Sequence, residues 1–453
     1  MTQTIAEAAH ALAGGRLSSR GLTEAALARI ADPAGEGSRV FIRVDAARAL
    51  ADADHSDRMR AAGWVPSPLA GVPLSVKDLF DIAGETTTAG SRVLRGGPLA
   101  NQDAPAVARL RAAGAVILGR TNMTEFAYSG LGLNPHWGTP RNVWDRDADG
   151  GTGRVPGGSS SGAGVAVAEG MGLGAVGTDT GGSVRIPAAA NGVVGFKPSQ
   201  YRVPLAGTLP LSPSLDSTGP LGRSVACCAL LDAILAGDAP RMPEAAQPGH
   251  IRLAVPRCSH LLDDLDSEVA LAFEAALTRL SAAGISLVEI DMPVLAGARD
   301  LLASGGGLSP PEAWRWHRTL LKERRADYDP RVARRIEGGA AVTAADYLDL
   351  VAMRAGLVEA GAAALDGVDG WLAPTLPCLP PAIAPLLGDD EAYMRANIRM
   401  LRNTAPVNVL DGCALTLPIS PPGAAPVGLM VSGAPGTDRR VLSVGLALEA
   451  ICR

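Results

Sequence analysis

The segment from Pro156 to Ala189, PGGSSSGAGVAVAEGMGLGAVGTDTGGSVRIPAA, places four serines among closely spaced glycines. A serine hydroxyl beside a base can attack a carbonyl carbon, and converging backbone N–H groups can receive the charge that develops on the carbonyl oxygen. Gly181 and Gly182, followed by Ser183, leave such N–H groups unobstructed. The segment therefore predicts a nucleophilic serine next to an oxyanion hole made of main chain.

Two familiar motifs overlap this segment, and neither fits its surroundings. Residues 158–162 match G-x-S-x-G around Ser160, but that turn needs a strand running into it, and the preceding DADGGTGRVP is typical of a loop. Gly172, Gly174 and Gly177 match G-x-G-x-x-G, yet they follow a helical pattern and lack the later acidic residue of a dinucleotide site. Close packing of small residues accounts for 161–177.

A nucleophilic serine needs a base, and none of the histidines has a convincing position in the chain. His136, in a loop, is the least unsuitable of the six: His10, His55, His136, His250, His260 and His317. Lys77 is the alternative, because it ends the apolar run 72–76, where a buried strand would carry a hydrophobic residue. Such a lysine either reaches the surface, pairs with Asp78 or Asp81, or is buried with a pKa lowered from about 10.4.

The elements that must position these residues alternate between helices and strands. Residues 104–113 predict a helix and 115–118 a strand; 224–237 predict a helix, 251–256 a strand, 266–284 a capped amphipathic helix and 285–292 a strand. Strands separated by helices indicate an α/β fold with a large, mixed, mostly parallel sheet covered by helices on both faces.

Composition narrows the class of protein. The 453 residues are 47% hydrophobic and 19% charged with a net charge of −5, and the charges are interspersed, which argues against binding to nucleic acid or an anionic membrane. The N-terminus lacks the pattern of a signal peptide, no apolar stretch is long enough to span a membrane, and most of the six cysteines lie in apolar contexts typical of reduced buried thiols. We expect a cytoplasmic protein.

The chain shows no repeat and no long linker, so we expect one domain over 1–453. Its parts are an N-terminal helical segment at 1–65, a core at 71–225 and a variable helical region at 295–364, which includes a charged stretch at 311–335.

Five segments resemble the amidase signature family. GVPLSVKDLFDIAG, AVILGRTNMTEFAYSG, HWGTPRN, RVPGGSSSGAGVAVA and LGAVGTDTGGSVRIPAAANGVVGFKPS follow one another in unbroken order between 71 and 225, and weaker likeness continues through SLDSTGPLGRSV and WLAPTLPCLPP. The resemblance implies the amidase-signature fold and an amidohydrolase that cleaves the C–N bond of an amide through a serine acyl-enzyme. One departure is Ala163, where many members carry a further serine.

The resemblance also implies a Ser-Ser-Lys triad. Ser183 corresponds to the acyl-forming nucleophile, Ser159 to the bridging serine, which follows a cis peptide bond from Gly158, and Lys77 to the general base.

Other residues of the same two loops are expected to support this triad. The backbone N–H groups of Thr180, Gly181 and Gly182, with that of Ser183, are expected to form the oxyanion hole. The supporting residues have structural roles: Ser160 steadies its loop, Ser161 caps the following helix, and Asp179 and Arg185 brace the second loop.

The sequence leaves three kinds of protein open, and with them the substrate. The chain is either a free-standing amidase acting on a small-molecule amide, the glutaminase (A) subunit of a tRNA-dependent amidotransferase, or a non-catalytic relative; the first is favoured, and a homodimer is possible. Specificity is expected in 123–143, in 295–364 and in the helix YMRANIRMLRNTAPVN, where Arg395, Arg399 or Arg402 could meet a carboxylate. The mechanism needs no cofactor, and no His/Cys/Asp cluster has the spacing of a metal site.

Overall fold

One sheet runs through the whole protein. The structure is a computed structural model that describes residues 3–256 and 259–452, so Cys258 lies outside the described residues. Its 11 strands follow the order β1-β3-β2-β4-β6-β5-β10-β11-β9-β7-β8. Their bounds are β1 Phe41–Val44, β2 Pro73–Lys77, β3 Val116–Thr121, β4 Gly174–Asp179, β5 Val194–Lys197, β6 Ser217–Gly222, β7 Arg252–Pro256, β8 Ser286–Ile290, β9 Trp371–Pro374, β10 Cys413–Pro418 and β11 Gly428–Gly433.

The sheet is mixed, as expected, and the direction of its strands changes across it. Strand β2 pairs in parallel with β3 and β4, and β7 pairs in parallel with β9 and β8. The successive pairs along β4-β6-β5-β10-β11-β9 are antiparallel, and so is the pair of β1 with β3. The helix-strand alternation in the sequence predicted the two parallel groups, where helices connect the strands. Antiparallel strands in the centre of the sheet join the two groups. Fewer strand pairs are therefore parallel than the alternation of helices and strands in the sequence indicates.

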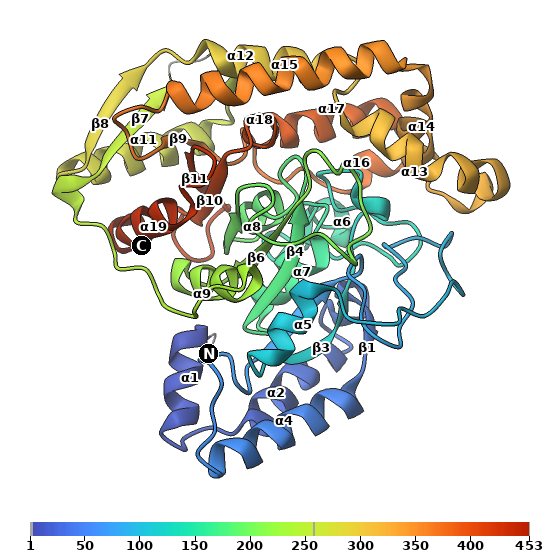
Figure 1. Cartoon of the computed structure of the whole chain (residues 1–453), viewed down its shortest axis with the longest axis vertical. Helices are drawn as coiled ribbons and strands as arrows, with labels where there is room; N and C mark the ends of the chain where they lie inside the picture. The colour runs from blue at the N-terminus through green and yellow to red at the C-terminus, as the bar shows by residue number, and fades with distance from the viewer. Residues whose placement is uncertain (1–2, 257–258, 453) are drawn as a thin grey trace.

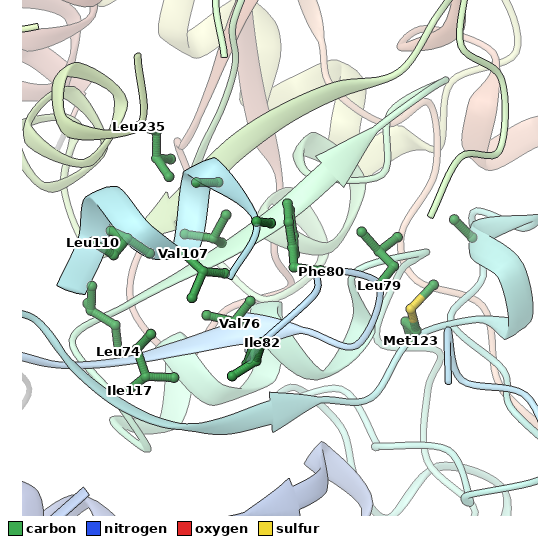
Figure 2. Packing of buried hydrophobic residues seen from close by; sticks show 14 of the residues in the cluster. Leu74, Val76, Leu79, Phe80, Ile82, Val107, Leu110, Ile117, Met123 and Leu235 are labelled. Carbon is green, nitrogen blue, oxygen red and sulfur yellow. The ribbon is translucent and has the colours of Figure 1, made fainter. Parts of the chain in front are cut away.

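Helices cover both faces of the sheet, which confirms that expectation. On one face, Leu74 and Val76 of β2 pack with Val107 and Leu110 of α5 and with Leu235 of α9 (Figure 2). The helices on this face are α1 Ile5–Ala13, α5 Pro105–Ala112, α9 Val225–Ala236, α11 Ser267–Ala282 and α19 Asp438–Cys452.

The opposite face carries the helices that position the candidate site. Successive residues of a strand point to opposite faces of the sheet. Leu118 of β3 and Ala175 of β4 therefore point to this second face, where α2, α4, α7 and α8 pack. The helices on this face are α2 Ser19–Ala31, α4 Ala46–Ala61, α7 Ser161–Glu169, α8 Arg185–Ala190, α12 Pro293–Ala303, α15 Ala344–Ala363 and α18 Ala405–Val409. Figure 1 shows α12 and α15 along one end of the molecule and α1, α2 and α4 at the other.

The remaining α-helices lie in the segments between these elements. They are α3 Gly37–Val40, α6 Ala148–Gly151, α10 Ser259–Leu262, α13 Ser309–Arg324, α14 Pro330–Glu337, α16 Ala384–Leu387 and α17 Asp390–Leu401. In the described ranges, no helix is both long and apolar enough to cross a membrane. The five described cysteines are buried and free, as expected: Cys227, Cys228, Cys378, Cys413 and Cys452.

The predicted elements match the observed ones, and the cap expected for the helix at 266–284 is wrong. Residues 104–113, 115–118, 224–237, 251–256, 266–284 and 285–292 correspond to α5, β3, α9, β7, α11 and β8, and 295–364 is helical. Asp266 precedes α11 but does not cap it with its side chain. Its carboxylate instead accepts hydrogen bonds from Leu379 N at 2.8 Å and Arg399 at 2.9 Å, because the segment after β9 packs against this end of the helix.

Candidate active site

Lys77 is the last residue of β2 and is fully buried. Its Nζ lies 2.7 Å from Ser159 Oγ and 2.9 Å from Thr178 Oγ1. Burial lowers the pKa of Lys77 to about 7, and the carboxylates of Asp216 and Asp179 act in the opposite direction. The two alternatives that kept this lysine protonated are wrong, because Lys77 does not reach the surface and its nearest partners are hydroxyls.

The aspartates that could have paired with Lys77 have other partners. Asp78 is buried beside Arg120, with 3.1 Å between Oδ1 and Nε, and Asp81 accepts a hydrogen bond from Thr87 Oγ1 at 2.7 Å. Lys77 is therefore held as a buried amine that contacts two hydroxyl groups, which is not the environment of a structural ion pair.

The two serine loops lie against each other. The Gly158–Ser159 peptide bond is cis, as the resemblance implies. Ser160 N donates to Ser183 O at 3.2 Å, and Ser160 Oγ donates weakly to Thr178 O at 3.4 Å, so Ser160 links its loop to the nucleophile loop. Among the described residues no hydrogen bond joins the hydroxyls of Ser159 and Ser183. Catalytic hydrogen bonds are often formed only when substrate is bound.

The expected cap of α7 by Ser161 is wrong. Ser161 is already the first residue of the helix, Ser160 occupies the capping position, and neither makes a side-chain cap. Ser161 Oγ donates to Asn122 O at 3.4 Å, and Gly162 N donates to the same carbonyl at 2.9 Å. The backbone of Asn122 therefore meets this helix N-terminus and takes the place of a side-chain cap.

Ser183 lies in the turn between β4 and α8 and is 4% exposed. The backbone N–H groups of Thr180, Gly181 and Ser183 have no partner among the hydrogen bonds of the described residues. Gly182 corrects one expectation: its φ is +134°, and its N–H donates to Asp179 Oδ1 at 2.8 Å, so this N–H is occupied in the free protein. The available donors are therefore those of Thr180, Gly181 and Ser183.

Asp179 and Arg185 brace this turn. Both side chains are fully buried, and Arg185 donates to Asp179 from Nη2 at 2.9 Å and from Nε at 3.0 Å. Asp179 also accepts from Val184 N at 3.1 Å, and Arg185 extends to Thr404 O and Asn408 Oδ1. Burial by itself raises the pKa of Asp179, but the adjacent guanidinium outweighs it and holds that pKa well below its ordinary value. This matches the structural role expected for both residues.

Thr178 and Asp216 belong to this site, although the motifs alone assigned them no role. Thr178 contacts Lys77 directly, and Asp216 accepts a hydrogen bond from Thr180 Oγ1 at 2.5 Å. Asp216 belongs to SLDSTGP, a segment that the resemblance covers only weakly. The signal that brings Asp216 here is the pairing of β4 with β6, which cannot be read from either strand alone.

The histidine and arginine candidates are engaged elsewhere. His136 Nε2 lies 2.7 Å from Glu125 Oε1, and His317 is buried with Nδ1 at 3.0 Å from the Tyr328 hydroxyl. The three arginines of the expected specificity helix also have protein partners: Arg395 pairs with Glu391, Arg399 with Asp266, and Arg402 donates to Leu261 O. None of these contacts involves Ser183.

Apolar side chains and one hydroxyl lie next to the turn that carries Ser183: Thr404 Oγ1 donates to Gly181 O at 2.7 Å. A Cβ placed on Gly181 would lie 3.4 Å from Leu401 Cδ2 and 3.8 Å from Ala405 Cβ, and one on Gly130 would lie 3.3 Å from Leu401 Cγ. A separate cavity of about 320 Å³ lies among Arg39, Asn134, Arg141 and Arg331, and the triad does not line it. No group of three His, Cys, Asp or Glu residues in the described ranges could hold a metal ion.

Comparisons with known proteins find relatives along most of the chain. The family model described as Amidase matches residues 21–442. The chain is 40% identical to 2-amino-5-chloromuconic acid deaminase of Comamonas testosteroni, over 90% of this chain and 87% of the relative. It is 34% identical to mandelamide hydrolase of Pseudomonas putida, over 99% and 91% of the two chains. It is 35% identical to the A subunit of the glutamyl-tRNA(Gln) amidotransferase of Roseiflexus castenholzii, over 99% and 95%.

The fold is also that of known amidases. A crystal structure of an amidase superimposes with a TM-score of 0.88 at 39% identity and covers 100% of both chains. Peptide amidase from Stenotrophomonas maltophilia superimposes with a TM-score of 0.82 at 28% identity, over 100% of this chain and 97% of the other. Sequence and fold agree over the whole length, and the chain belongs to the amidase family, whose members are hydrolases acting on amide C–N bonds.

Proposed function

We propose that this amidase hydrolyses a small amide through a covalent acyl-enzyme on Ser183, with Ser159 as the proton relay and Lys77 as the general base. The observation that carries the proposal is the buried Lys77 amine, 2.7 Å from Ser159 Oγ. A lysine buried among hydroxyls is costly unless it is neutral, and a neutral amine with a pKa near 7 is suited to proton transfer at neutral pH.

The acylation step follows from this arrangement. Neutral Lys77 takes the proton of Ser159 Oγ while Ser159 takes the proton of Ser183 Oγ, which forms a bond to the amide carbon. The π electrons of the carbonyl move to its oxygen, which backbone N–H groups of Thr180, Gly181 and Ser183 can receive. The Lys77 ammonium then returns its proton through Ser159 to the amide nitrogen as the C–N bond breaks. Water attacks the ester by the same route and releases the carboxylate.

The acyl group of the substrate is proposed to be apolar next to the carbonyl. Leu401 and Ala405 lie beside Gly181, and the arginines that could have bound a carboxylate are paired within the protein. Two relatives are named for 2-amino-5-chloromuconic acid deamination and for mandelamide hydrolysis, so an unsaturated amino acid and aryl amides belong in a first survey. Glutamine belongs there too, since one relative is part of a tRNA-dependent amidotransferase.

Ammonia release by the purified chain tests the proposal. We expect turnover of at least one primary amide from a panel of acetamide, benzamide, mandelamide, indoleacetamide, a malonamate and glutamine. Ser183→Ala is expected to lower kcat by at least about 10³-fold, because alanine lacks the hydroxyl that forms the proposed acyl-enzyme. Ser161→Ala is the matched control and should keep activity within about threefold, since its hydroxyl makes only one weak bond to Asn122 O.

Each alternative has its own outcome. Turnover that persists in Ser183→Ala would contradict the acyl-enzyme. Activity on glutamine alone, and only after partner chains are added, would favour the glutaminase subunit. A protein that turns over nothing and whose Ser183 does not react with a fluorophosphonate would be the non-catalytic relative.

A further inference from the structure

The register of β4 against β6 places Asp216 beside the turn 180–183, which carries Ser183. In the antiparallel pairing of β4 with β6, Thr178 lies opposite Thr218 and Asp179 opposite Ser217. The next opposed positions, just beyond the two strands, are Thr180 and Asp216. Thr180 Oγ1 donates to Asp216 Oδ1 at 2.5 Å, and each of the two residues is 5% exposed. The carboxylate therefore contacts a residue of the oxyanion turn from the neighbouring strand.

No guanidinium or ammonium group of the described residues makes a hydrogen bond or ion pair with Asp216. Its second oxygen accepts from Leu211 N at 3.0 Å and Ser212 N at 3.1 Å. Burial raises the pKa of Asp216 to about 7, the three hydrogen bonds oppose that rise, and the Glu312 carboxylate adds to it. Asp179 differs because it is held directly by Arg185. A buried carboxylate without a bonded cation is costly, which suggests a functional reason for it.

The Asp216 carboxylate raises the pKa of Lys77 through its charge. The carboxylates whose charge acts on Lys77 are those of Asp216 and Asp179, and Arg185 already compensates Asp179. Above its pKa of about 7, Asp216 thus supplies a negative charge that acts on Lys77 and that no bonded cation neutralises. An opposite charge nearby stabilises an ammonium ion, and an ammonium ion is what Lys77 becomes when it accepts the proton.

Hydrogen bonds from the helical region 295–364 hold the loop that carries Asp216. Glu312 of α13 accepts from Ser212 Oγ at 2.7 Å and from Ser214 N at 3.1 Å, and the Tyr347 hydroxyl of α15 donates to Glu312 at 2.7 Å. Side chains from two helices beyond the core therefore hold the turn from which the Asp216 carboxylate faces Thr180.

We propose that Asp216 is a positioning residue of the amidase reaction: its carboxylate holds Thr180 in the oxyanion turn and stabilises the ammonium form of Lys77 while Ser183 is attacking. The inference rests on the proposed triad. It assigns Asp216 two effects, one on the geometry of the turn through the Thr180 hydroxyl and one on the charge of the base. The second effect separates this role from a purely structural one.

The rate at which a fluorophosphonate labels Ser183 tests the proposal without knowledge of the substrate. In this reaction Ser183 Oγ bonds to phosphorus, fluoride leaves, and the serine proton passes through Ser159 to Lys77. Asp216→Asn keeps the size and one of the two acceptor oxygens but removes the charge. We expect the rate at high pH to fall about tenfold and the acid limb of the pH profile to move at least about one unit lower, because Lys77 loses an anion that favours its protonated form.

Two further variants serve as a control and as an alternative to Asp216→Asn. Asp232→Asn neutralises another buried carboxylate, which lies in α9 and pairs with Arg202, and it should leave the acid limb of the pH profile in place. Thr180→Val removes the hydrogen bond that lowers the pKa of Asp216, so Asp216 is protonated more often and the acid limb should move in the same direction by a smaller amount. This variant decides the question if Asp216→Asn does not fold.

The outcomes separate this inference from the proposed function. A profile whose acid limb stays in place in Asp216→Asn, whatever the change in rate, overturns the role of Asp216 while Ser183 labelling in the wild type still stands. If Ser183→Ala is labelled as fast as the wild type, the proposed nucleophile fails and Asp216 loses its role with it.

Discussion

Lys77→Met is expected to reduce both amide turnover and fluorophosphonate labelling of Ser183 by at least about 10³-fold. Methionine fills a similar buried volume, but it cannot accept the proton that Ser159 relays. The backbone donors around Ser183 stay in place, so binding of a substrate analogue should change little while kcat falls. The measurements are single-turnover rates and an inhibitor dissociation constant for both proteins. A double variant with Ser183→Ala should be no slower than either single variant, because the two residues act as one unit.

The same substitution is expected to change stability in a pH-dependent way. The pKa of Lys77 is about 7 in the folded protein and 10.5 ordinarily, so between these values the unfolded chain binds the proton and the folded chain does not. Wild-type stability therefore rises with pH across this window, by up to about 1.4 kcal/mol per pKa unit. Lys77→Met lacks this dependence. Its stability relative to the wild type should be greatest below pH 7 and should decline towards pH 10.5.

A second buried lysine provides the comparison. Lys197 Nζ donates to Pro198 O at 2.8 Å and to Gly412 O at 2.7 Å, and burial lowers its pKa to about 8. Lys197→Met leaves two carbonyls without their donor and should lose about 1–3 kcal/mol while Ser183 still reacts. If both variants lose labelling equally, buried lysines support the fold in general and Lys77 has no special role as the base.

The residues at the centre of the site could be predicted because their signals are local. A lysine at the end of an apolar run, paired glycines before a serine and a glycine-bounded serine cluster are each visible within a few positions. Two details could not be read this way. The N–H of Gly182 is taken by Asp179, and the start of α7 is met by Asn122 O, because both contacts depend on how the backbone turns after the strand.

The fold shows the same division between local and long-range information. Helices next to strands predicted the parallel groups around β2 and β7, since a crossover helix makes neighbouring strands parallel. The antiparallel pairing of β5 with β10 places Lys197 opposite Ala414, a residue far away in the sequence, and nothing within either strand indicates that partner. Asp216 depends on long-range pairing of the same kind, which explains why the motifs alone assigned it no role.

Arg185→Met is expected to lower the free energy of unfolding by about 3–5 kcal/mol, because it leaves Asp179 fully buried without its cation. Urea unfolding at pH 7 measures this loss. Adding Asp179→Asn should recover part of it, since asparagine is neutral and its one amide oxygen can still accept from either Gly182 N or Val184 N. A loss below about 1 kcal/mol, or no recovery in the double variant, would contradict the bracing role of the pair.

The pH dependence of this variant gives an independent check. In the wild type the pKa of Asp179 lies below its ordinary value, so the pair stabilises the fold at neutral pH, and this contribution is lost as the pH falls below about 3.8. Without Arg185, burial raises the pKa of Asp179 instead, and the penalty for its charge grows above that pH. The difference between wild type and Arg185→Met should therefore narrow as the solution is acidified from pH 7. A constant difference would mean that Arg185 stabilises the turn through packing and its bonds to Thr404 and Asn408, and not through the charge of Asp179.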